Sequence, residues 1–169
     1  MSRLGAIHLT KYTGVKHSAT VFYFHGSGGS GDNMKEWVRL MSDFTFPHIN
    51  IVYPTAPAQS YTPAGGLLSN VWFDRADISI EVPEKLDSIS EIEKEVRYLI
   101  QKENEASIPC NRIVVGGFSM GGCLALHTAY RWVRDVAGVF AFSSFLNDNS
   151  IVYEDLKNAG INGMYKIIK

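Results

Sequence analysis

IVVGGFSMGG, residues 113–122, is the stretch of sequence that decides the fold. The apolar run Ile113–Val115 is typical of a buried strand, and residues 121–132 have a helical pattern. Between them lies Gly117-x-Ser119-x-Gly121, the pattern of a nucleophile elbow, a turn so tight that glycines flank the serine. We therefore expect Ser119 Oγ to project at the carboxyl end of the strand, beside a helix N-terminus. The alternative is an ordinary glycine-rich turn with a capping serine.

The rest of the chain alternates short apolar runs with helical patterns. Runs typical of strands lie at about 5–10, 18–24, 49–53, 112–117 and 136–142, and helical patterns lie at 31–44, 87–105 and 121–132. Because parallel neighbours need crossover connections, this alternation predicts an α/β fold with a mainly parallel sheet and helices on both faces. Three prolines and a glycine pair predict a long irregular loop over residues 54–70.

Composition narrows the class of protein. The 169 residues, 46% of them apolar, predict one globular domain. Sixteen basic and 17 acidic residues give a net charge of -1, which predicts no nucleic-acid or anionic-membrane partner. The longest apolar stretch, Val136–Phe142, is far below the ~20 residues of a membrane span. Cys110 and Cys123 form neither a disulfide framework nor a zinc site, so we expect no metal and a reducing, cytoplasmic location.

A second glycine-rich loop, HGSGGSGDN at residues 25–33, follows the strand predicted at 18–24. Gly26, Gly28 and Gly31 match the G-x-G-x-x-G pattern of dinucleotide sites, which also need an acidic residue at the end of the next strand. That strand here ends Val52-Tyr53-Pro54, without a carboxylate, so we expect no dinucleotide cofactor. The loop is better interpreted as a donor of backbone N–H groups to an oxyanion, and a flexible turn without a ligand is the alternative.

Four segments together carry a resemblance to a known family. They are His25-Gly26, YPTAP at 53–57, NVWFD at 70–74 and GGFSMGG at 116–122. The chain resembles the acyl-protein thioesterase/lysophospholipase family from about residue 15 to 147. The resemblance implies an α/β-hydrolase fold, no cofactor, and S-acylated (palmitoylated) proteins or small acyl esters as substrates.

The same resemblance implies roles for five residues. Ser119 would be the nucleophile, and the backbone N–H groups of Ser27 and Met120 would form the oxyanion hole. Trp72 and Phe73 would line the substrate groove.

The chain departs from the family pattern after Ser119. In this fold an acid and then a histidine follow the serine, and the histidine activates the hydroxyl. His127 is the only histidine after Ser119. It lies eight residues along the same predicted helix, about 12 Å away at 1.5 Å per residue, beyond hydrogen-bond reach. The sequence therefore predicts a nucleophile without its triad acid and base.

Family members continue past residues 136–142 with further strand and helix units. We accordingly expect a partial, C-terminally truncated hydrolase domain over 1–147 and a divergent tail over 148–169. The strand at 136–142 would then be an exposed apolar edge. Two functions remain open: a serine hydrolase with little turnover on its own, or a non-catalytic fragment that binds acyl groups or proteins. The sequence predicts no oligomeric state.

Overall fold

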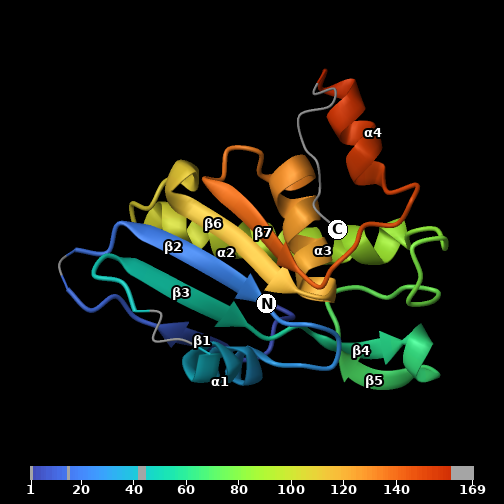
Figure 1. Ribbon diagram of the computed structural model, residues 1–169, viewed down its shortest axis with the longest axis horizontal. Helices are drawn as coiled ribbons and strands as arrows, with labels where there is room; N and C mark the ends of the chain where they lie inside the picture. The colour runs from blue at the N-terminus through green and yellow to red at the C-terminus, as the bar shows by residue number, and fades with distance from the viewer. Residues whose placement is uncertain (1, 15, 42–44, 161–169) are drawn as a thin grey trace.

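The structure, a computed structural model, describes residues 2–14, 16–41 and 45–160 and is built around one twisted sheet (Figure 1). Its five strands lie in the order β1-β3-β2-β6-β7. Their bounds are β1 Ile7–Thr10, β2 Ala19–Phe24, β3 Ile49–Pro54, β6 Ile113–Phe118 and β7 Gly138–Phe142. All neighbours pair in parallel except β1, which is antiparallel to β3. The predicted mainly parallel sheet is confirmed.

Helices cover both faces of the sheet, as predicted. Helix α1 (Gly31–Met41) packs on one face, while α2 (Leu86–Glu105) and α3 (Met120–His127) lie on the other (Figure 1). Because side chains alternate along a strand, β2 serves both layers. Phe22 and Phe24 belong to the cluster that contains α2 and α3, whereas Tyr23 packs with residues of α1.

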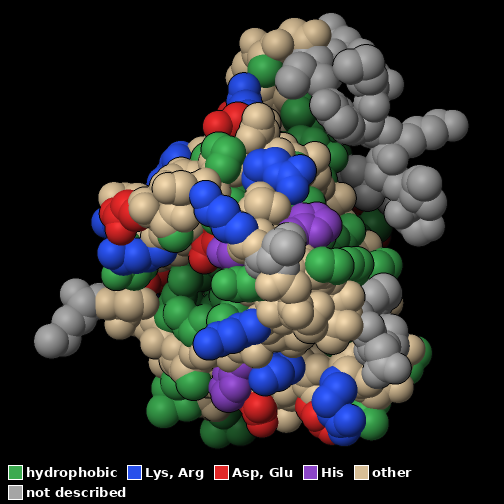
Figure 2. Space-filling model, turned by 90° about the vertical axis from the view of Figure 1, so that its left-hand side faces the viewer, with side chains coloured by type: hydrophobic (Ala, Val, Ile, Leu, Met, Phe, Trp, Pro, Cys, Tyr) green, Lys and Arg blue, Asp and Glu red, His purple; other side chains and the backbone are tan. Residues whose placement is uncertain are grey.

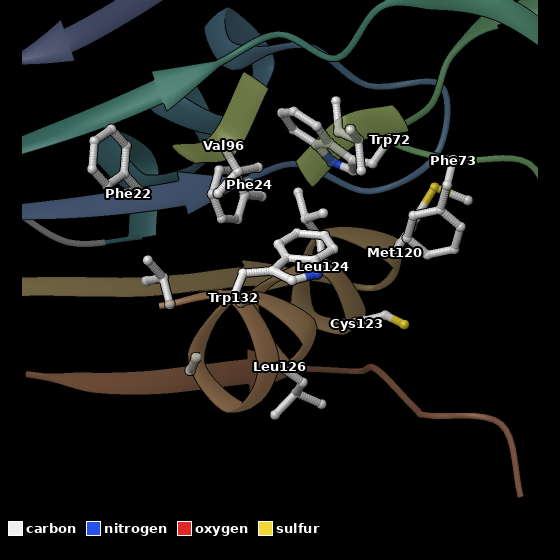
Figure 3. Packing of buried hydrophobic residues seen from close by; sticks show 14 of the residues in the cluster. Phe22, Phe24, Trp72, Phe73, Val96, Met120, Cys123, Leu124, Leu126 and Trp132 are labelled. Atoms are coloured by element: carbon white, nitrogen blue, oxygen red, sulfur yellow. The ribbon is translucent and has the colours of Figure 1, made fainter. Parts of the chain in front are cut away.

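The larger of the two clusters joins β2, α2, α3 and the segment that precedes α2 (Figure 3). Trp72 belongs to this cluster, and its ring meets Phe24 edge-on at a centroid distance of 5.1 Å. Its indole Nε1–H donates to the His25 carbonyl at 2.7 Å, so the polar atom of this buried side chain is satisfied. The core therefore reaches the glycine-rich loop that begins at His25.

The prediction of one helix over residues 121–132 is only partly right. Helix α3 ends at His127, and a π-helical turn, η3 (Thr128–Trp132), continues it. Thr128 Oγ1 donates to the Leu124 carbonyl at 2.8 Å, a back-bond that competes with the regular helical pattern.

The prediction of an irregular loop over 54–70 is wrong. The segment forms an antiparallel hairpin, β4 (Ala58–Tyr61) and β5 (Leu67–Asn70), with a short 3-10 turn η1 (Thr62–Ala64) between the strands. Gly65 and Gly66 close the turn with φ values of 66° and 82°, which explains the glycine pair. Its prolines stand at the ends of strands and in η1, where no ladder hydrogen bond is lost.

A helix that the sequence did not predict, α4 (Ile151–Asn158), lies in the tail and projects from the body in Figure 1. Polar contacts hold its first turn: Glu84 accepts the Ile151 N–H at 3.1 Å, and Ser150 Oγ caps the helix. Residues 161–169, the end of the predicted tail, lie outside the described residues. The division of the chain at residue 147 stays a prediction.

Figure 2 shows the side of the molecule at the amino ends of the parallel strands, where described basic, acidic and histidine side chains are interspersed. No helix among the described residues combines the length and apolar character needed to cross a membrane.

The Glu84 contacts predict how acid and mutation affect stability. Arg131 donates to His127 Nδ1, so the Nε2–H of this buried imidazole donates to Glu84 Oε1 at 3.1 Å. Burial alone would raise the pKa of Glu84, but hydrogen bonds from His127, Ser150 and Ile151 outweigh it and lower the pKa. Ionised Glu84 therefore stabilises the fold above pH 4.5, its ordinary pKa, and that stabilisation is lost as the pH falls through the lowered pKa.

We expect Glu84→Gln to lower the free energy of unfolding by about 2 kcal/mol at pH 7, measured by urea denaturation, because hydrogen bonds to a charged group are lost. The difference from wild type should shrink in acid. Glu93→Gln is the matched control, because Glu93 pairs with Arg97 at the surface and should cost under about 0.5 kcal/mol. Equal effects of the two substitutions would show that the Glu84 contacts do not anchor α4.

Candidate active site

Ser119 occupies the sharp turn between β6 and α3. Its φ of 52° is positive, a conformation that non-glycine residues adopt rarely and that functional turns retain. A Cβ at Gly117 would stand 2.4 Å from the carbonyl carbon of Gly121, and one at Gly121 would stand 2.2 Å from the Phe24 oxygen. No side chain fits at either position, so the glycines of the motif are required by contact with each other and with β2.

The turn contacts both strands that neighbour β6, namely β2 and β7. Phe24 ends β2 against Gly121, and the Ser119 N–H donates to the Phe142 carbonyl at the end of β7 at 2.9 Å. Ser119 is partly exposed, and its Oγ has no hydrogen-bond partner among the described residues. No sequence pattern predicts the Phe142 contact, because a backbone acceptor depends on tertiary packing and not on residue type.

The loop after β2 lies directly against this turn. A Cβ at Gly26 would stand 3.3 Å from Ser119 Cβ, and Ser27 Oγ lies 3.7 Å from Met120 Sδ. The structure therefore brings together the three residues that the sequence proposed for the nucleophile and the oxyanion hole. The N–H groups of Gly28 and Gly29 donate to backbone carbonyls. Those of Ser27 and Met120 have no acceptor among the described residues, which leaves two donors beside Ser119.

His25 fixes the start of this loop. Its Nε2 accepts the Ala56 N–H at 2.9 Å, so its Nδ1–H donates to the Gly26 carbonyl at 2.6 Å. Burial lowers the pKa of His25, more than the Gly26 hydrogen bond raises it, which keeps the ring neutral. Both ring nitrogens are engaged, so His25 holds the loop to the end of β3 and offers no free nitrogen to Ser119.

The other four histidines also lie in other surroundings. His127 is buried between Glu84 and Arg131. His17 and His48 flank the amino ends of β2 and β3, about 20 Å of strand away from the carboxyl end where Ser119 lies. His8 pairs with Asp32 at 3.4 Å.

Trp72 and Phe73 are placed in the core. Their exposed fractions are 1% and 3%, and the Trp72 indole supports the His25 loop from within. A groove is instead present on the other side of the turn, where Ser27, Trp37 and Phe118 border a hollow of about 340 Å³. A role for Trp72 and Phe73 in contacting substrate stays a prediction.

Comparison with known proteins agrees with this geometry. Residues 8–163 match the family described as phospholipase/carboxylesterase. The chain belongs to this family. The match includes the elbow, the His25 loop and the start of the tail, and it extends past residue 147.

The relatives of the chain include a lysophospholipase-like protein and acyl-protein thioesterases. Mouse lysophospholipase-like protein 1 is 51% identical over 161 residues, covering 92% of this chain and 67% of that protein. Acyl-protein thioesterase 1 of Mycosarcoma maydis is 33% identical over 156 residues, covering 86% of this chain and 65% of that protein. The crystal structure of maize acyl-protein thioesterase 2 superposes with a TM-score of 0.72 at 25% identity, covering 90% of this chain and 68% of that one. The chain thus spans about two thirds of the length of these relatives.

The elbow glycines give a direct test of the site geometry. We expect Gly121→Ala to destabilise the protein by about 3 kcal/mol or more, because its methyl group would collide with the Phe24 carbonyl, which is backbone and cannot rotate away. Gly138→Ala in β7 is the control, because its Cβ would meet Val114 at an ordinary 4.0 Å. Denaturant unfolding of both variants measures the effect, and a Gly121→Ala protein as stable as the control would refute the described contact.

Proposed function

We propose that the chain carries the nucleophile of a serine hydrolase of the acyl-protein thioesterase/carboxylesterase type. Its substrates would be S-acyl (palmitoyl) protein thioesters or small acyl esters. The observation that supports this most strongly is Ser119 at positive φ between two glycines, with the unpaired Ser27 and Met120 N–H groups beside it. Membership of the phospholipase/carboxylesterase family and the named activities of the relatives agree with it.

The chemistry follows from this arrangement. Ser119 Oγ would attack the acyl carbonyl carbon while its proton passes to a water molecule, and the carbonyl oxygen would become an oxyanion. The Ser27 and Met120 N–H groups would stabilise that charge. Each oxyanion-hole donor typically lowers the activation free energy by about 3 kcal/mol. Collapse of the tetrahedral intermediate expels the thiolate or alkoxide and leaves an acyl-Ser119 enzyme, which water then hydrolyses.

Proton removal from Ser119 limits this chemistry in the chain as given. None of its five histidines has a ring nitrogen in contact with Ser119 Oγ. Loss of a triad base costs several orders of magnitude in rate, while oxyanion stabilisation sustains a residual reaction. We therefore propose slow turnover by residues 1–169 alone, in the cytoplasm, where free thiols such as Cys110 and Cys123 persist.

A second function, non-catalytic binding of acyl groups, is favoured by one observation. Trp37 and Phe118, which border the hollow beside Ser27, also line an apolar groove of about 550 Å³, a size typical of ligand sites. An aliphatic chain could occupy this groove whether or not Ser119 reacts.

Hydrolysis of p-nitrophenyl acetate and of an acyl thioester distinguishes the two. We expect residues 1–169 to turn over at least about 10³-fold more slowly than mouse lysophospholipase-like protein 1, with the residual rate abolished by Ser119→Ala. A residual rate that survives Ser119→Ala would refute the nucleophile. A Ser119-dependent rate equal to that of the mouse protein would refute the missing base.

The matching binding measurement uses tryptophan fluorescence with a non-hydrolysable acyl analogue, since Trp37 borders the groove. Saturable binding without any Ser119-dependent hydrolysis would favour the second function.

A further inference from the structure

Arg75 is a cation inside the fold without an acidic partner. Only 8% of the residue is exposed, and its Nε is buried with no hydrogen-bond partner. Among the described residues none forms an ion pair with its guanidinium or accepts a hydrogen bond from it. Taking a charge out of water is costly, so buried cations are ordinarily paired with an acid. An unpaired one therefore requires an explanation.

Two aromatic rings enclose this guanidinium. Its Cζ lies 5.2 Å from the centroid of the Phe73 ring and 5.3 Å from the centroid of the Phe145 ring. Such contacts attract a cation, but they offset only part of the cost of desolvating it. Because the rings occupy the space around the guanidinium, a ligand has to approach along the N–H bonds, where arginine binds both oxygens of a carboxylate.

The acidic and thiol side chains in this region do not supply the missing negative charge. Asp74 pairs with Lys85 at 2.5 Å, and Glu84 is engaged in the contacts that hold α4. The thiol of Cys123 is fully buried. Desolvation raises its pKa to about 12, although the charge of Arg75 opposes this shift, so the thiol is neutral. The cation is therefore available to an anion from outside the chain.

Arg75 lies beside the turn of helix that begins at Ser119. Phe73, whose ring contacts the guanidinium, belongs to the same core cluster as Met120, and both are drawn in Figure 3. Cys123, whose thiol responds to the charge of Arg75, donates its N–H to the Ser119 carbonyl at 3.2 Å. One turn of helix, about 5.4 Å, separates these two residues. The cation is thus a short distance from the candidate nucleophile.

The segment that follows β7 encloses the same region. Ser143 has a φ of 47°, a conformation that non-glycine residues adopt rarely. Ser144 Oγ is buried without a hydrogen-bond partner, and it lies 2.8 Å from the place where a Cβ at Gly122 would stand. Phe145 then contacts Arg75. Backbone strain and an unpartnered polar atom next to an unpaired cation are typical of a binding site.

We propose that Arg75 anchors an anion subsite and binds the carboxylate at the far end of a short acyl group whose carbonyl lies at Ser119. Among small acyl esters and thioesters, the substrates would then be those of dicarboxylic acids. A glutaryl group, with three methylenes between its carbonyl carbons, is comparable in length with one turn of helix, about 5.4 Å. An acyl group is narrow enough to reach a residue that is 8% exposed, whereas a protein leaving group is not.

This inference rests on the proposed function for the position of the reacting carbonyl, and it adds the class of acyl group. A long apolar chain does not suit the subsite, because its end would leave the guanidinium unpaired. Phosphate shares the chemistry of a carboxylate toward arginine, so the experiment includes it.

The kinetic experiment compares p-nitrophenyl hemiglutarate with p-nitrophenyl valerate, which has the same number of acyl carbons and no carboxylate. Rates are taken as the part that Ser119→Ala removes. We expect residues 1–169 to show a kcat/KM at least about tenfold higher for hemiglutarate, because the carboxylate pairs with a desolvated guanidinium. The difference should lie mainly in KM, because Arg75 would contact the end of the acyl group and not the reacting carbonyl.

Three substitutions test the residue. Arg75→Met should remove the preference for hemiglutarate. Arg75→Lys keeps the charge without the paired N–H donors and should retain part of the preference. Arg97→Met is the matched control, because it removes an exposed cation from α2 and should leave the preference unchanged. Circular dichroism of each variant confirms its folding.

Binding is measured separately in the Ser119→Ala protein, so that it does not depend on hydrolysis. Monomethyl glutarate is titrated while NMR follows the Nε–H signal of Arg75, identified as the signal that Arg75→Met removes. We expect a saturable shift of this signal at millimolar ligand. Methyl valerate, which carries no charge, and inorganic phosphate should each bind at least about tenfold more weakly.

A preference for hemiglutarate that survives Arg75→Met would overturn the subsite, as would an Arg75 signal that monomethyl glutarate does not move. Tighter binding of phosphate would overturn the assignment to a carboxylate. Binding of monomethyl glutarate without Ser119-dependent hydrolysis of either ester would support the subsite and contradict the proposed function. Ser119-dependent hydrolysis of both esters at equal rates would support the proposed function and contradict the subsite.

Discussion

The site depends on one close contact, between the turn that follows β6 and the last residue of β2. Phe24 presents its carbonyl oxygen where a Cβ of Gly121 would stand only 2.2 Å away, and Gly117 is equally enclosed. This approach is possible because two glycines remove the side chains that would separate the segments. It places the loop after β2 against Ser119, so one packing constraint within the sheet generates both the exposed hydroxyl and its neighbouring N–H donors.

A second set of contacts keeps that loop in place. His25 accepts hydrogen bonds from the Ala56 N–H at its ring and from the Trp72 indole at its carbonyl. Its ring also donates a hydrogen bond to the Gly26 carbonyl. Hydrogen bonds of this kind contribute about 1 kcal/mol each, and their buried partners could not be left unpaired without a larger cost. The glycines beyond His25 therefore belong to an anchored loop, which is the condition for preorganised stabilisation of an oxyanion.

The order of strands and helices could be predicted from the sequence because it depends on local patterns of apolar, glycine and polar residues. Apolar runs marked the five strands of the sheet, and the glycine motif after Val115 marked the elbow. The β4–β5 hairpin was not predicted because the prolines of this segment suggest a loop, although Pro54 and Pro57 stand at strand ends and Pro63 lies in η1. Helix α4 was hidden because Glu84, far away in the sequence, holds its first turn. Trp72 was expected at a groove, but its burial depends on Phe24 and His25, which no local pattern reveals.

The reactivity of Ser119 itself tests the central claim most directly. Residues 1–169 would be incubated with a fluorophosphonate, and intact-protein and peptide mass spectrometry would follow the adduct over time. The geometry predicts slow labelling confined to Ser119, because the hydroxyl and the N–H donors are in place while no histidine assists. Labelling of other serines at the same rate, or no labelling of Ser119 at all, would contradict a nucleophile elbow at this turn.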